Sequence, residues 1–145
     1  MEQRISIVTL GVNDLERAVA FYRALGWHGQ VVQETAFFQA GPIVLVLWDR
    51  LKLAADAGVP DAADRDGFGG IALAHNVRLP GEVDDLIALA RAAGADVTRS
   101  PADTFYGGYA AYFRDLDGHA WEIAYNPGFT LGADGSLTLP DFKMD

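Results

Sequence analysis

The order of strand-like and helix-like segments occurs twice along this chain, and the repeat is the strongest constraint on its fold. In the first copy, residues 5–12 are apolar and β-branched, and Asn13-Asp14 then opens a helix with Glu16 at capping-box spacing. Apolar residues recur at helical spacing until Gly26, which occupies the position of a C-cap glycine. Three short strands follow, at 30–32, 35–39 and 43–48. The first copy therefore predicts a βαβββ module.

The second copy repeats this order. A strand begins at Gly70, a helix enters at Pro80-Gly81, and the helix ends Arg23-Ala24-Leu25-Gly26 and Arg91-Ala92-Ala93-Gly94 correspond. Strand material follows at 96–99, 109–114 and 120–125. We expect a single domain with module 1 at about 1–50, a linker with one helical turn at about 51–68, module 2 at about 69–127, and a C-terminal extension at 128–145. Asp134-Gly135 signals a hairpin in that extension.

One βαβββ module leaves a sheet with one unfinished face, so two copies are expected to combine. The predicted fold class is α+β: two βαβββ modules form a curved, open barrel-like mixed sheet with helices outside and a central cleft. Side chains alternate between the two faces of each strand. By this rule Glu122 points to the cleft, whereas Trp121, Ile123 and His75 point to the helices.

Composition excludes several functional classes. The 145 residues carry a net charge of -9 without a basic stripe, which argues against nucleic-acid binding and is compatible with cationic ligands. With no cysteine, any metal would need His or carboxylate ligands. Ser100 and Ser136 lack the context of a nucleophile elbow, and no glycine sequence forms a phosphate loop. No apolar run is long enough to span a membrane and no signal peptide is visible, so we expect a cytoplasmic protein that does not bind membranes.

Two passages resemble a known family. They are TLGVNDLERAVAFYRALGW (Thr9 to Trp27) and YFRDLDGHAWEIAYNP (Tyr112 to Pro127), and together with the repeat they are similar to the vicinal oxygen chelate superfamily, which includes glyoxalases, bleomycin-resistance proteins and ring-cleaving dioxygenases. The resemblance implies paired βαβββ modules, frequent homodimers, and in many members a divalent ion held by His or Glu from four equivalent strand positions.

Only one of those four positions carries a metal ligand here. The resemblance puts the last ligand on Glu122, but the first-strand position falls on Ile7 and the end of the first module falls near Leu45 or Leu47. In the second module the His position falls on Ala72 or Gly70, depending on register. Three protein ligands are usual for a catalytic divalent ion, so we predict no bound metal and no other cofactor.

Aromatic residues supply the remaining candidates for ligand binding, because tyrosine and tryptophan combine an apolar body with a polar tip. The expected ligand-binding residues are Trp48, Phe105, Tyr106, Tyr109, Tyr112 and Glu122. The stretch from Thr104 to Tyr109 is interpreted as a mobile, glycine-hinged edge over the pocket. His28 and His119 are expected at the surface without partners.

Three functions remain open at this stage. The first is a metal-free protein that binds a drug or metabolite in an aromatic, apolar cleft. The second is an enzyme related to the family's lyases, isomerases or dioxygenases, with Glu122 as the catalytic residue, either a metal ligand or a general base. The third is a non-catalytic, dimeric interaction module whose cleft is filled by its own side chains. Fold resemblance alone does not choose among them.

Overall fold

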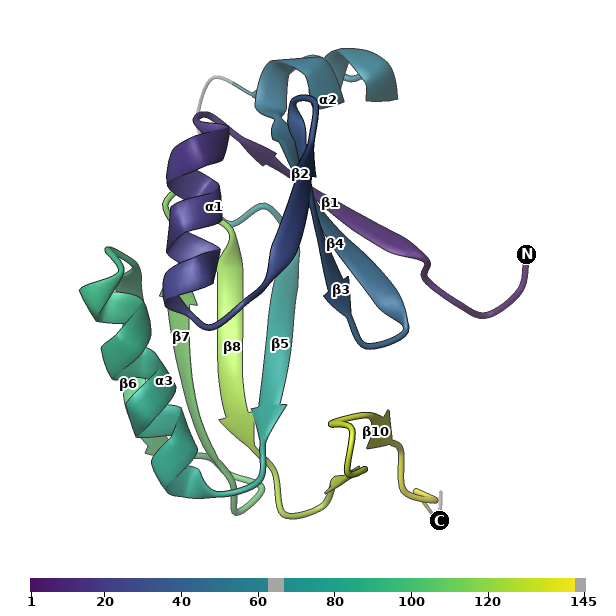
Figure 1. Cartoon of the computed structure of the whole chain (residues 1–145). Helices are drawn as coiled ribbons and strands as arrows, with labels where there is room; N and C mark the ends of the chain where they lie inside the picture. The colour runs from purple at the N-terminus through teal and green to yellow at the C-terminus, as the bar shows by residue number, and fades with distance from the viewer. Residues whose placement is uncertain (63–66, 143–145) are drawn as a thin grey trace.

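The computed structural model describes residues 1–62 and 67–142, and it contains the predicted repeat (Figure 1). The first module consists of β1 (Ile7–Val12), α1 (Leu15–Ala24), β2 (Gly29–Val32), β3 (Thr35–Ala40) and β4 (Ile43–Asp49). The second consists of β5 (Ala72–Val77), α3 (Pro80–Ala92), β6 (Asp96–Asp103), β7 (Tyr109–Arg114) and β8 (Ala120–Tyr125). Between them lies α2 (Arg50–Ala57), and the chain continues into β9 (Thr130–Leu131) and β10 (Leu137–Thr138).

Local sequence signals set the ends of the two long helices. At the start of α1, the Asp14 carboxylate accepts a hydrogen bond of 3.0 Å from the backbone N–H of Arg17. At its end, Gly26 has a φ of 92°, a left-handed conformation that favours glycine. In α3, Pro80 occupies the first turn, and the Glu82 side chain accepts a hydrogen bond of 2.8 Å from the backbone N–H of Leu79. Both helices therefore begin where the sequence predicts.

The two modules form sheets of the same topology, which confirms the predicted α+β fold of two βαβββ units. The strand orders are β1-β4-β3-β2 and β5-β8-β7-β6, and in each sheet the first pair is parallel while the other pairs are antiparallel. At the start of the parallel pair, Ile7 lies opposite Val44 in the first module, and Ala72 lies opposite Ala120 in the second. This shared register makes β1 equivalent to β5 and β4 equivalent to β8. Within the described residues, the two sheets are not joined by strand pairing.

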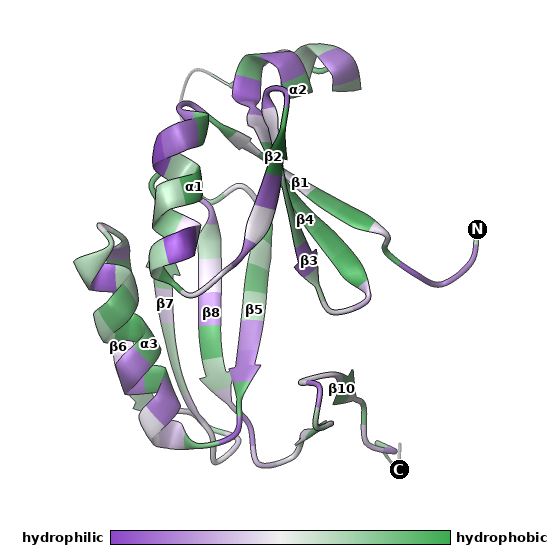
Figure 2. Ribbon diagram, viewed as in Figure 1, coloured by the Kyte–Doolittle hydropathy of each residue, from purple (hydrophilic) through white to green (hydrophobic). Residues whose placement is uncertain are grey.

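A common core on the helix side unites the modules. Phe21 and Tyr22 of α1 meet the second sheet, with ring centroids 6.3 Å from Phe113 and 6.1 Å from Trp121, respectively. Tyr22 and Phe38 are each 1% exposed, so α1 is buried against both sheets. Figure 2 shows apolar residues along β1 and β4. Burial of these apolar side chains is the main favourable contribution to the fold.

Several element boundaries differ from the sequence prediction. The linker contains an eight-residue helix, α2, in place of a single turn, because Asp49 caps it through the backbone N–H of Lys52 and Gly58 ends it with a φ of 69°. Part of the predicted linker, 63–66, lies outside the described residues. In the second module, β6 extends to Asp103 rather than ending at residue 99. Strand β5 begins at Ala72 rather than at Gly70, which has a φ of 85°.

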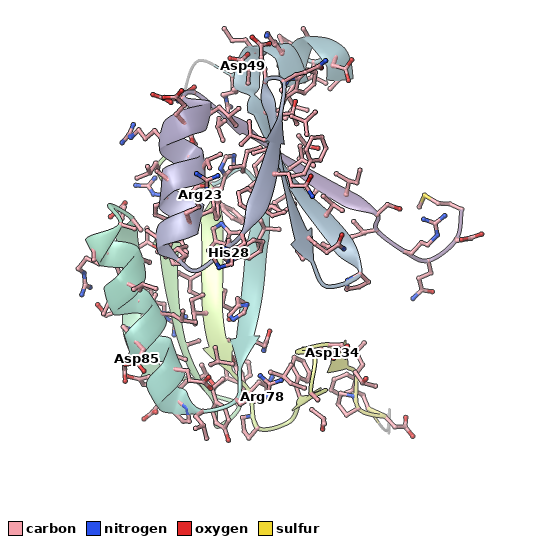
Figure 3. The ribbon with its side chains drawn as sticks, viewed as in Figure 1. Arg23, His28, Asp49, Arg78, Asp85 and Asp134 are labelled. Carbon is pink, nitrogen blue, oxygen red and sulfur yellow. The ribbon has the colours of Figure 1, made fainter. Side chains whose placement is uncertain are left out.

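The C-terminal extension folds back beside the second sheet. Its strands β9 and β10 pair antiparallel, with Gly135 at a φ of 83° in the turn, as the Asp-Gly signal predicts. An Arg78 Nη atom donates a hydrogen bond of 2.6 Å to the carbonyl of Gly132, and Figure 3 shows Arg78 beside Asp134. None of the helices in the described part of the chain is long and apolar enough to cross a membrane.

Candidate functional site

An open groove of about 690 Å³ lies where the two modules meet. Its apolar wall comes from β1 and from the segment leading into β5, and includes Val8, Leu10, Phe68, Ile71 and Leu73. Its polar wall comes from β6, β7 and the β7–β8 turn, and includes Arg99, Tyr112, Arg114 and His119. An apolar depression with a few convergent polar groups is the usual form of a small-molecule site.

Tyr112 and Glu122 stand next to each other on the face of the second sheet that points away from the helices. They are directly paired in register between β7 and β8, so their side chains are neighbours on that face. Partial burial raises the pKa of Tyr112, and the charge of Glu122 raises it further. Tyr112 is therefore a hydrogen-bond donor at neutral pH. The Arg114 side chain, further along β7, lies 2.7 Å from the Asp96 carboxylate.

The shared register defines the four strand positions at which the family resemblance places a divalent ion. Ala72, rather than Gly70, is equivalent to Ile7, and Val46 is equivalent to Glu122. The sequence-based placement on Leu45 or Leu47 is wrong, because both side chains are buried on the helix side, at 3% and 0% exposure.

These four residues do not fit a metal ion, because only Glu122 offers an oxygen ligand. The described residues contain no group of three or more His, Asp or Glu side chains that could hold one. His75 lies on β5, next to β8, the strand that carries Glu122. Its side chain points to the helix side of the second sheet, away from Glu122.

His75 lines a second cavity, of about 250 Å³, on the helix side of the second sheet. Trp121 and Ile123 line the same cavity, as the alternation of side chains along the strands predicts. Partial loss of hydration lowers the pKa of His75, so its imidazole is neutral at pH 7. A bulge that would turn His75 toward Glu122 is absent, since β5 and β8 pair without interruption from Ala72 to Val77.

His119 has a partner that the sequence analysis missed. Its Nδ1 lies 2.9 Å and 3.1 Å from the two carboxylate oxygens of Asp115, and its side chain is 21% exposed on the groove wall. Asp115 is buried, and its carboxylate also accepts a hydrogen bond of 2.6 Å from the hydroxyl of Tyr22. The expectation of an exposed, unpartnered His119 is therefore wrong. The sequence did contain a signal for this pair, because Asp115 and His119 are four residues apart on either side of the turn residues Asp117-Gly118. His28, in contrast, is exposed beyond the end of α1 (Figure 3).

The other predicted ligand-binding residues lie apart from the groove. Tyr109 faces the helix side, where its hydroxyl donates a hydrogen bond of 2.8 Å to Asp84 of α3. Phe105 and Tyr106 are exposed in the β6–β7 turn, at the opposite end of β7 from Arg114. Trp48 is half-buried on β4, next to Gly11 of β1, which itself lines the groove. Of the predicted set, the structure thus brings Tyr112 into the groove lining and places Glu122 beside it.

The segment around Phe105, which the sequence analysis interpreted as a mobile edge over the pocket, is a turn held by hydrogen bonds between Thr104 and Gly108. The backbone N–H of Thr104 donates to the Gly108 carbonyl over 3.0 Å, and the N–H of Gly108 donates to the Thr104 hydroxyl over 2.9 Å. Gly107 adopts a φ of 78°, which explains the glycine at this position. This segment is a hairpin turn at the far end of the sheet, and it does not cover the groove.

Two βαβββ modules with a cleft at their junction define a recognised class of fold, and the sequence places the chain within it. Residues 4–123 match the model of the Glyoxalase/Bleomycin resistance protein/Dioxygenase superfamily, so the chain belongs to that family. No curated protein is similar enough in sequence to match.

Solved structures extend this relationship. The chain is 39% identical to a glyoxalase-related enzyme from Fulvimarina pelagi, over 95% of this chain and 99% of that one, with a TM-score of 0.87. It is 28% identical to a glyoxalase/bleomycin resistance protein/dioxygenase from Nocardioides, over 91% of each chain, with a TM-score of 0.71. A fosfomycin resistance protein from Mesorhizobium loti, 21% identical over 87% of this chain and 94% of that one with a TM-score of 0.65, shares the fold.

Proposed function

We propose that this protein binds a small organic molecule in the groove between its modules, without a resident metal. The observation that carries this proposal is the lining of the groove, in which an apolar wall from β1 and Phe68 faces polar side chains from β6, β7 and the β7–β8 turn. Its volume of about 690 Å³ suits a drug-sized molecule or metabolite.

The basic side chains in the groove lining favour an acidic ligand. Arg99, Arg114 and His119 line the groove, and among the described lining residues there is no Asp or Glu. The net charge of -9 belongs to the whole chain and does not describe this lining. Within the described residues Arg99 makes no ion pair, which leaves its guanidinium able to bind a carboxylate or phosphate.

A homodimer is part of this proposal. Ile7, Val32 and Phe37 lie on the face of the first sheet away from α1, and they are 54%, 54% and 39% exposed. Phe68 and Ile71, at the groove, are 76% and 71% exposed. Clustered exposed apolar residues are typical of contact surfaces, and a second copy of the chain would bury them.

The enzyme hypothesis has one specific observation in its favour. The neighbouring side chains of Tyr112 and Glu122 combine a hydroxyl donor with a carboxylate at the edge of the groove, an arrangement that suits general acid–base chemistry. Glu122 would act there as a base rather than as a metal ligand. The interaction-module hypothesis has less support, because the groove is open rather than filled by the chain's own side chains.

Filling the groove tests the binding proposal. Ala120 lines the groove on β8, so Ala120→Trp would occupy the ligand's space, whereas Ala92→Trp places the same side chain at the exposed end of α3. A screen of aromatic and aliphatic acids by thermal shift should yield compounds that stabilise the unmodified protein by about 2.7 kcal/mol at 100-fold excess over Kd. We expect this stabilisation to be lost in Ala120→Trp and kept in Ala92→Trp.

Two outcomes contradict the proposal. Equal stabilisation of both variants would place the ligand elsewhere on the protein. Stoichiometric metal in the purified protein, measured by elemental analysis, would contradict the metal-free site and would require ligands beyond Glu122.

A further inference from the structure

The helix-side cavity, the space of about 250 Å³ that His75 lines, is separate from the groove. It lies between the C-terminal end of α1, the helix α3 and the face of the second sheet that carries Trp121 and Ile123. The groove lies on the opposite face of that sheet, and the described linings of the two spaces have no residue in common. A ligand in the helix-side cavity would therefore occupy a site of its own.

The floor of the helix-side cavity is aromatic and formed in advance. Phe113 of β7 and Trp121 of β8 are stacked with their ring planes 8° apart, and both are buried. The Trp27 ring packs edge-on against them, with its centroid 5.9 Å from that of Trp121 and 6.1 Å from that of Tyr22. Because these rings hold one another in place, a ligand would not have to order them, and preorganisation of this kind favours binding.

The lining of this cavity selects an uncharged aromatic ligand. Its described residues include no Asp, Glu, Lys or Arg, and transfer of an unpaired charge from water into such surroundings is strongly unfavourable. Contact between aromatic rings is more favourable than burial of the same area alone, so an aromatic ring suits the floor. An apolar cavity of about 150 Å³ binds benzene. The larger cavity here, about 250 Å³, has room for two fused rings.

One polar side chain, His75, lies at the mouth of the cavity. It is exposed on β5, the edge strand of the second sheet, whereas the floor is buried. Its imidazole is neutral at pH 7, because partial loss of hydration lowers its pKa, and it then carries one donor and one acceptor nitrogen. Within the described residues no hydrogen bond engages this ring. A hydroxyl group both donates and accepts, so it can pair with either nitrogen of the ring.

We propose that the helix-side cavity is a second ligand site, which binds a small uncharged aromatic molecule that carries one hydroxyl group. The ring packs on Phe113 and Trp121, and the hydroxyl lies at the mouth, where it forms a hydrogen bond with His75. This site does not depend on the groove, whose lining favours an acidic ligand. The two faces of the second sheet thus bind ligands of different charge.

Titration calorimetry with 2-naphthol, which has two fused rings and one hydroxyl, tests the site. At pH 7 we expect one molecule bound per chain. Leu86→Trp should abolish binding, because Leu86 of α3 lines the cavity and the larger side chain would occupy the ligand's space. The matched control is Leu89→Trp on the same helix, where Leu89 is 43% exposed and outside the lining. This variant, and Ala120→Trp in the groove, should bind 2-naphthol as the unmodified protein does.

The hydrogen bond with His75 is tested by comparing 2-naphthol with naphthalene, which lacks the hydroxyl. His75→Phe keeps a ring at the mouth but removes both nitrogens. We expect it to weaken binding of 2-naphthol by about 2–10-fold, the effect of one neutral hydrogen bond, and to leave binding of naphthalene unchanged. His28→Phe, at an exposed position outside the cavity, should change neither. Equal weakening of both ligands in His75→Phe would contradict the hydrogen bond and with it the hydroxyl in the ligand class.

Nuclear Overhauser effects locate the ligand without any substitution, so they decide the proposal even if Leu86→Trp fails to fold. We expect them between the ring protons of bound 2-naphthol and the side chains of Trp121 and Ile123. Contacts with Tyr112 and Ala120 instead would place 2-naphthol in the groove and overturn the second site. Absence of saturable 2-naphthol binding would overturn it as well. The acid screen with Ala120→Trp tests the groove separately.

Discussion

At the scale of single residues, Tyr22 connects the two modules through one hydroxyl group. Burial and the neighbouring Asp115 raise its pKa, so the hydroxyl stays protonated and donates to the Asp115 carboxylate over 2.6 Å. The same oxygen accepts a hydrogen bond of 3.1 Å from Nε1 of Trp121. The Tyr22 hydroxyl oxygen of α1 therefore links the Asp115 carboxylate in the β7–β8 turn to the Trp121 indole of β8.

Replacing this tyrosine should be costly. Tyr22→Phe leaves a buried carboxylate and a buried indole N–H each without one partner, so we expect the free energy of unfolding to fall by about 1–3 kcal/mol. The matched control is Tyr109→Phe, which removes an exposed hydroxyl bonded to Asp84 and should change stability by no more than about 0.5 kcal/mol. Urea denaturation of both variants measures the difference, and similar losses in the two would contradict the buried network.

At the scale of elements, the close approach of β2 to β3 depends on a glycine. Gly29 pairs with Phe38 at the start of β2, and a Cβ atom there would lie 2.5 Å from the Phe37 carbonyl oxygen and 2.6 Å from the Phe38 ring. Because the backbone cannot retreat without breaking the strand pairing, the hairpin requires a residue without a side chain.

We therefore predict that Gly29→Ala destabilises the protein by about 1–3 kcal/mol through overpacking. Gly81→Ala is the control with the opposite expectation, since Gly81 lies in the first turn of α3 with no atom within 4 Å of the added Cβ. Alanine there should be neutral or stabilising by up to about 1 kcal/mol. Thermal melts of both variants test the pair, and a stable Gly29→Ala would show that β2 can shift away from β3.

At the scale of the whole molecule, the exposed face of the first sheet predicts self-association. Phe37→Glu places a charge among Ile7 and Val32 on that face and should shift the protein from dimer to monomer. Val59→Glu, which changes an exposed apolar residue after α2, should have no such effect. Light scattering after size-exclusion chromatography reads the mass, about twice 15.6 kDa for the dimer. A monomeric unmodified protein at high concentration would refute this prediction.

The sequence by itself determined the features that depend on local patterns. Helical spacing and caps located α1 and α3, and two-residue alternation assigned His75 and Trp121 to the helix side of the second sheet. The repeat predicted two modules of equal topology, and the Asp-Gly pair predicted the C-terminal hairpin. These features follow from contacts between residues close in sequence, or from a period that the chain displays directly.

Only the tertiary structure decided the composition of the groove and its polar network. Strand pairing between β1 and β4 made Val46, not Leu45 or Leu47, the residue equivalent to Glu122, and a one-residue change of register would reverse every side chain. Asp115 is 93 positions from Tyr22, with which it shares a hydrogen bond, and the distant residues Phe68 and Arg99 line the same groove. Such partners are selected by packing of distant segments, which no local pattern encodes, and so Tyr112 is the one aromatic residue of the predicted set that belongs to the groove lining.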